Sequence, residues 1–85
     1  MRRIAFLPAA FKDFRYWIEH DERMYKRLIG LLEDMLHDPF RGIGKPEPLK
    51  YELVGLWSRR INDEHRLVYK VTEDEIVIVS CRFHY

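Results

Sequence analysis

The residues best suited to chemistry lie in residues 42–50, where one carboxylate is surrounded by cations. Glu47 stands between Pro46 and Pro48. Pro48 disfavours the helical region for Glu47, and the ring of Pro46 fixes its own φ at about −65°. The carboxylate is therefore presented from a stiff, extended segment. The cations that we expect it to face are Lys45, Lys50, Arg59, Arg60 and Arg66. This arrangement suits phosphoryl chemistry on a polyanion, although charged networks also occur on solvated structural surfaces.

A second group with useful chemistry is His84, which is followed by Tyr85 and its terminal carboxylate. A nearby anion raises the pKa of an imidazole, so we expect His84 to be able to donate a proton near neutral pH. Terminal residues are often frayed. The apolar stretch Ile76-Val77-Ile78-Val79 just before them predicts that the tail is held by a strand.

Glu47, Arg66 and His84 together could cleave RNA without a metal. Glu47 would act as the base on a ribose 2′-OH, His84 would protonate the leaving 5′-oxygen, and Arg66 would stabilise charge on the phosphoryl oxygens. The four histidines lack ligand-like spacing, and the lone Cys81 is interpreted as a buried apolar residue. We therefore expect no metal and no cofactor.

The elements that must position these residues can be read from periodicity. Residues 2–7 read as a strand, Pro8 suits a helix start, and Phe11, Phe14, Trp17 and Ile18 fall at helical spacing that predicts a core face. A second helix is expected from the N-cap Asp21 to Asp38-Pro39. Its predicted apolar face comprises Met24, Leu28, Leu31, Leu32 and Met35.

Three further strands are expected over residues 56–62, 65–71 and 75–83. Trp57 is interpreted as a core anchor, and residues 76–79 are apolar on both faces, which favours a central place in the sheet. The order predicts a single α+β domain, residues 1–85, with an N-terminal strand and a two-helix hairpin packed on an antiparallel sheet.

The register of the strand pair at residues 56–71 decides which arginine joins the site. Residues paired across a hairpin share a face. Arg60 converges with Arg66 only if an odd number of residues separates the strands, whereas an even number brings Arg59 there instead. The sequence leaves both alternatives open.

Composition limits the class of protein. Lys+Arg 15 against Asp+Glu 14 gives a net charge of +1, which argues against coating nucleic acid through bulk charge. The single cysteine fits a reducing compartment such as the cytoplasm. No run approaches the roughly 20 apolar residues of a membrane span, so no membrane partner is expected.

Four motifs in order resemble a known family. They are Gly44-Lys45-Pro46-Glu47-Pro48-Leu49-Lys50, Leu56-Trp57-Ser58-Arg59-Arg60-Ile61, Glu64-His65-Arg66-Leu67-Val68-Tyr69 and Cys81-Arg82-Phe83-His84-Tyr85. Together they closely resemble the YoeB/Txe-type toxins of the RelE/ParE toxin–antitoxin superfamily. The resemblance implies a RelE-like, microbial RNase-like fold and ribosome-associated cleavage of messenger RNA in the A site.

The resemblance also implies roles for single residues. Glu47 would be the general base, Arg66 the transition-state stabiliser and His84 the general acid, with Tyr85 positioning the substrate. Arg60 and Lys50 correspond to phosphate contacts, and Arg59 and Lys45 are kept as further phosphate-binding candidates.

The implied partners are a YefM/Axe-like antitoxin, the ribosome and mRNA, with operator DNA bound only through the antitoxin complex. Homodimers occur in the family, and the exposed helical faces here would allow one. The alternative function is that of a non-enzymatic, ParE-like toxin that binds a protein target such as gyrase, since fold does not determine function.

Overall fold

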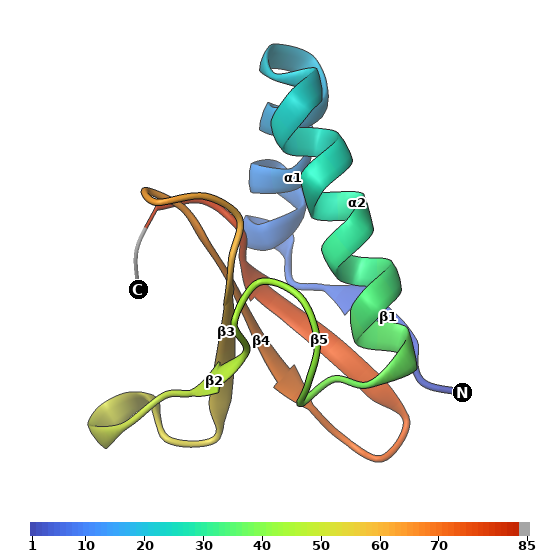
Figure 1. The fold of residues 1–85 in the computed structure, drawn as a ribbon, viewed down its shortest axis with the longest axis vertical. Helices are drawn as coiled ribbons and strands as arrows, with labels where there is room; N and C mark the ends of the chain where they lie inside the picture. Colours follow the sequence, from blue (N-terminus) through green and yellow to red (C-terminus); the bar gives the residue numbers. More distant parts are fainter. Residues whose placement is uncertain (84–85) are drawn as a thin grey trace.

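The computed structural model describes residues 1–83 and contains two helices, one 3₁₀ turn and five strands. The elements in chain order are β1 (Arg3–Phe6), α1 (Pro8–His20), α2 (Glu22–His37), β2 (Glu47–Pro48), the 3₁₀ turn η1 (Tyr51–Leu53), β3 (Leu56–Arg60), β4 (Arg66–Val71) and β5 (Glu75–Ser80). The predicted α+β class is confirmed, and Figure 1 shows the two helices running side by side.

The helices begin and end where local chemistry requires. Pro8 occupies the first turn of α1, where its missing N–H costs nothing. Asp21 separates the helices and is the N-cap of α2, because its Oδ1 accepts the N–H of Met24 at 3.1 Å. α2 ends at His37, as predicted, with Asp38 as its C-cap.

The sheet has the order β1-β5-β4-β3-β2. β3, β4 and β5 pair antiparallel as predicted, but β1 pairs parallel with β5, from Arg3 opposite Glu75 to Phe6 opposite Ile78. The sheet is therefore mixed, which corrects the expectation of a purely antiparallel sheet. β5 is an inner strand, which fits its apolar composition, and β4 is the middle one.

The core lies between the helices and one face of the sheet. The predicted face of α2 is buried throughout, and it packs with Leu67, Tyr69, Ile76 and Ile78 of the sheet. In α1 the inward face differs from the prediction. Phe14 and Trp17 pack inward, but Phe11 and Ile18 are 50% and 49% exposed. Ala10 takes the inward position one turn before Phe14.

Trp57 is partly buried against this core, as predicted, and its ring centroid lies 5.0 Å from that of Phe40.

Within residues 1–83, neither helix is long and apolar enough to cross a membrane.

Candidate functional site

The face of the sheet away from the helices carries three of the predicted site residues. β2 pairs with β3 so that Glu47 lies opposite Ser58, and β3 pairs with β4 so that Arg60 lies opposite Arg66. Side chains alternate between the faces of a strand, so Ser58 and Arg60 share a face, and Glu47 and Arg66 share it with them. Residues 61–65 separate the two strands, an odd number, and this settles the register in favour of Arg60.

Arg59 points to the other face, so the phosphate contact predicted for it does not fit the structure. Its guanidinium is fully buried. Nη1 donates to Asp34 Oδ2 at 2.6 Å and to the Ile43 carbonyl at 3.1 Å. Nη2 donates to the carbonyls of Asp38 and Arg41 at 2.7 and 3.0 Å. The guanidinium nitrogens therefore all donate hydrogen bonds within the protein, and these bonds hold residues 38–43 against α2.

This buried arginine also determines two pKa values. The hydrogen bond from Arg59 is the main reason that the pKa of Asp34 lies below its usual value, and the N–H of Ile43, 3.0 Å from Oδ2, adds to the effect. Burial raises the pKa of Tyr69, whose neutral hydroxyl accepts from Arg59 Nε and donates to the Pro39 carbonyl at 2.7 Å. The loop is thus tied to both α2 and β4.

The loop leads directly into Glu47. Gly42 and Gly44 have φ values of 130° and 78°, which only glycine adopts easily. The Gly44 carbonyl accepts the N–H of Arg60 at 2.7 Å, three residues before Glu47. The anchored loop therefore delivers the exposed carboxylate of Glu47 to the edge of the sheet beside β3.

Lys50 lies near Glu47, because both line one shallow pocket with Tyr51 and the rest of η1. Tyr51 is 90% exposed and has a φ of 58°, an unusual conformation for a large side chain. No role was predicted for Tyr51 from the sequence. The only signal for it was an aromatic residue directly after the cationic motif. Lys45 is exposed and also has a positive φ of 53°.

The guanidinium of Arg66 is anchored at one end to the β3–β4 loop. Its Nη1 donates to the carbonyls of Asn62, His65 and Asp63 at 2.7, 3.2 and 3.3 Å. This anchoring limits the rotamers of Arg66 and keeps a positive charge at the end of the hairpin, on the face shared with Glu47 and Arg60.

The chain returns to this hairpin at Phe83. The N–H of Phe83 donates to His65 Nδ1 at 2.7 Å, and its carbonyl accepts the N–H of Arg66 at 3.1 Å. The candidate acid His84 and the candidate positioning residue Tyr85 lie outside the described residues. No role was predicted for His65 from the sequence either. A side chain that binds backbone atoms needs no particular partner residue, so the only signal for His65 was its position next to Arg66.

Cys81 is buried, and this burial raises its pKa to about 12. A thiol with so high a pKa stays protonated and is a poor nucleophile at neutral pH, in agreement with its interpretation as an apolar core residue.

Comparison with known proteins identifies the family. The family model described as "YoeB-like toxin of bacterial type II toxin-antitoxin system" matches residues 6–85. A toxin YoeB of Streptomyces coelicolor is 53% identical over 83 residues, which cover 98% of this chain and 99% of the relative.

Solved structures agree with this assignment. A YoeB/ParE toxin from Agrobacterium tumefaciens superimposes with a TM-score of 0.94 at 39% identity, covering 98% and 99% of the two chains. The YoeB dimer from Staphylococcus aureus gives 0.92 at 47% identity, covering 99% and 98%. The heterotetrameric YoeB-YefM complex from the same organism gives 0.90 at 46% identity, covering 100% and 99%.

The expected RelE-like fold is also confirmed. The toxin–antitoxin complex RelBE2 from Mycobacterium tuberculosis shares the fold, with a TM-score of 0.76 at 22% identity and coverage of 98% of both chains. The two-helix hairpin on a mixed sheet, the four motifs and the matches over nearly the whole length lead to one assignment: the chain belongs to the YoeB-like toxins of bacterial type II toxin–antitoxin systems.

Proposed function

We propose that this toxin is a metal-independent endoribonuclease that cleaves messenger RNA in the ribosomal A site and so inhibits translation. The observation that supports this most is the register of β2, β3 and β4, because it gives Glu47, Arg60 and Arg66 a common sheet face. A surface that only bound another protein would not require a carboxylate held on the same face as two arginines.

The proposed reaction is an internal transfer at phosphorus. Glu47 takes the proton of the 2′-OH, the 2′-oxygen attacks the adjacent phosphorus, and the bond to the 5′-oxygen breaks as His84 protonates that oxygen. The products are a 2′,3′-cyclic phosphate and a 5′-OH. Arg66 stabilises charge on the phosphoryl oxygens, and each positioned acid or base contributes roughly 10²–10⁴-fold.

The remaining candidates are assigned to substrate binding. Lys50, Arg60 and Lys45 contact phosphates of the RNA. Tyr85 positions the substrate. Arg59 is left out because its donors are used within the fold.

The low net charge supports the ribosome as the partner that presents the RNA. A net charge of +1 provides little non-specific attraction to free RNA. The cations are instead gathered near Glu47, where a strand already held by the ribosome would meet them.

We further propose that a YefM-like antitoxin binds and neutralises this toxin, a proposal supported by the similarity to the S. aureus YoeB that forms a complex with YefM. A segment with carboxylates and apolar anchors would cover the cations of Lys50, Arg60 and Arg66. We expect operator DNA to be bound only through that complex. A homodimer like that of the S. aureus toxin and a place in the cytoplasm complete the proposal.

The test is to map mRNA 5′ ends in a translation extract with purified wild-type toxin, Glu47→Gln and His84→Gln. We expect cuts that require ribosomes and leave a cyclic phosphate, with at least 100-fold slower cleavage in either variant, the lower contribution of one acid–base group. Glu73→Gln and His37→Gln are matched controls, because both side chains are exposed and lie outside the proposed site.

Two results would overturn the proposal. One is an intact mRNA population in an actively translating extract, which would make gyrase poisoning the next assay. The other is full cleavage by both Glu47→Gln and His84→Gln, which would remove acid–base catalysis by these residues.

A further inference from the structure

We propose that His65 is a positioning residue that holds the backbone of Phe83 and thereby fixes the start of the His84-Tyr85 segment for catalysis. This inference rests on the proposed function, since it concerns the support of the proposed acid. It begins from one contact, the 2.7 Å hydrogen bond in which the Phe83 N–H donates to Nδ1 of His65. A buried imidazole, 7% exposed, is thus used to bind main chain one residue before His84.

The hydrogen bond from the Phe83 N–H determines the tautomer of the His65 imidazole. Because Nδ1 accepts a hydrogen bond, the proton of the neutral ring must lie on Nε2. Nε2 faces Glu64 Oε1 at 3.4 Å, an acceptor that suits this tautomer. The ring is also packed edge-on against Trp17, with centroids 4.8 Å apart. The contacts with Glu64 and Trp17 therefore orient the His65 ring independently of its hydrogen bond with Phe83.

The backbone of His65 is fixed as well. The side-chain oxygen of Asn62 accepts the N–H groups of Glu64 and His65 at 2.9 and 2.7 Å. The His65 carbonyl accepts the N–H of Ile61 at 3.0 Å and Nη1 of Arg66 at 3.2 Å. These hydrogen bonds fix the backbone of the turn, and the fixed backbone in turn limits where the imidazole can lie.

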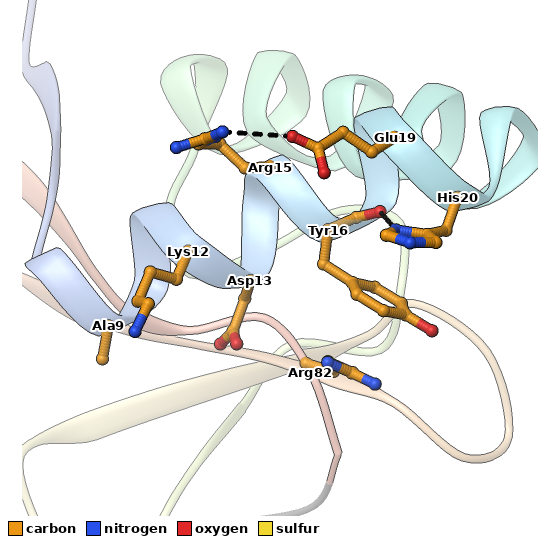
Figure 2. Close-up of a pocket in the computed structure, with 8 residues that line it drawn as sticks. All are labelled: Ala9, Lys12, Asp13, Arg15, Tyr16, Glu19, His20 and Arg82. Atoms are coloured by element: carbon orange, nitrogen blue, oxygen red, sulfur yellow. Dashed lines mark hydrogen bonds and ion pairs between the residues drawn. The ribbon is translucent and has the colours of Figure 1, made fainter.

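Phe83 is held from its other sides too. Its φ is 64°, a left-handed conformation that costs free energy in a non-glycine residue and persists only where the surroundings enforce it. The guanidinium of Arg82 lies 4.6 Å from the Phe83 ring centroid and 3.5 Å from that of Tyr16. Figure 2 shows Arg82 beneath the ring of Tyr16. The carbonyl of Phe83 accepts the Arg66 N–H.

Two consecutive residues thus hold the same peptide segment. His65 and Arg66 both bind the backbone of Phe83, and the side chain of Arg66 is the proposed clamp for the phosphoryl oxygens. The acid and the clamp therefore share one support, so an error in the position of Phe83 would move the acid relative to the clamp. Catalysis is sensitive to such errors, since a displacement of about 1 Å can cost on the order of 100-fold.

The experiment compares wild-type toxin with His65→Leu and His65→Asn. The amide oxygen of asparagine occupies nearly the place of Nδ1 and can accept the Phe83 N–H, whereas leucine fills the space without an acceptor. His37→Asn is the control, since this exposed imidazole lies at the end of α2. If His65→Leu does not fold, His65→Gln replaces it, because its amide lies one bond too far out.

Three quantities are measured for each variant. Cleavage is followed on ribosome–mRNA complexes with toxin in excess, which gives the rate at saturation and the half-saturating toxin concentration. Hydrogen exchange of the Phe83 amide reports the contact directly, and thermal unfolding reports stability. We expect His65→Leu to lower the saturating rate by about 10- to 100-fold with little change in half-saturation, to expose the Phe83 amide, and to be largely rescued by His65→Asn.

The outcomes separate this inference from the proposed function. If the wild type does not cleave, the proposed function fails and the catalytic use of the contact fails with it. If the wild type cleaves and His65→Leu cleaves at the same saturating rate, only the inference is overturned. A Phe83 amide that exchanges freely in the folded wild type would likewise overturn the inference alone, as would equal losses of rate in His65→Asn and His65→Leu.

Discussion

Arg59 and Arg60 are neighbours of the same type on one strand, yet they have opposite environments. The side chain of Arg59 is fully buried with five partners, whereas Arg60 is exposed on the face shared with Glu47. The alternation of a strand places the two side chains on opposite faces, and the contacts of Arg59 with Asp34 and residues 38–43 complete its burial. Substitutions at the two positions should therefore affect different properties, stability for Arg59 and substrate binding for Arg60.

We expect Arg60→Gln to raise the half-saturating toxin concentration for mRNA cleavage on the order of tenfold, the value of one charge-assisted hydrogen bond. The melting temperature should hardly change, because the side chain is exposed. Lys70→Gln is the matched control. It removes the same charge from the same face, four residues beyond Arg66 along β4. Equal effects of the two variants in the cleavage assay would mean that only overall charge matters.

At the scale of elements, the segment of residues 38–44 acts as a tether between α2 and the sheet. Asp34 and Arg59 hold its middle, and Gly44 joins its end to β3 through the N–H of Arg60. Glu47 follows three residues later, so the position of the proposed base depends on a backbone path that passes through left-handed glycines.

Gly44→Ala should destabilise this tether. A Cβ there would lie 2.7 Å from Leu31 Cδ2 and 3.1 Å from the Arg60 carbonyl, at a φ of 78°. We expect a loss of about 1–2 kcal/mol in the free energy of unfolding and slower cleavage. Gly30→Ala is the control within α2. Its Cβ would meet nothing within 4 Å, so it should stabilise the helix by about 0.5–1 kcal/mol. Urea denaturation would measure both, and equal effects would contradict the argument.

At the scale of the whole molecule, the Asp34–Arg59 pair links stability to pH. The pKa of Asp34 is lowered in the folded state by Arg59, so its contribution is complete above the ordinary carboxyl value and is lost as pH falls through the lower folded value. Asp34→Asn leaves the Arg59 charge buried without an anionic partner.

We therefore expect Asp34→Asn to cost about 3 kcal/mol of unfolding free energy at pH 7 and progressively less as the solution is acidified below pH 3.8. The comparison is urea denaturation at a series of pH values. Glu33→Gln, an exposed carboxylate on the same helix, is the control and should show little effect at any pH. A constant difference between Asp34→Asn and wild type across that range would show that the carboxylate charge is not responsible.

Much of this architecture follows from sequence. The N-cap Asp21, the apolar face of α2 and the three-stranded meander were all predictable from local patterns. The parallel pairing of β1 was not, because four residues carry no signal of their direction and their partner is about 70 residues away. Residues of the candidate site were found by motif. The pairing of Arg60 with Arg66 depended on the strand register, which the sequence left open. The burial of Arg59 depended on its ion pair with Asp34, and no pattern in the α2 sequence indicates that pair.

The pairing of β1 with β5 has a consequence for synthesis. Arg3–Phe6 emerges from the ribosome first, but its hydrogen-bonding partner, Glu75 to Ile78, is translated nearly last. Until then β1 has no strand to pair with, and contacts between such distant residues form slowly. A polypeptide interrupted before residue 75 lacks β5, the inner strand that joins β1 to the rest of the sheet, and every residue after it. We expect such incomplete toxin to be harmless to the cell that makes it.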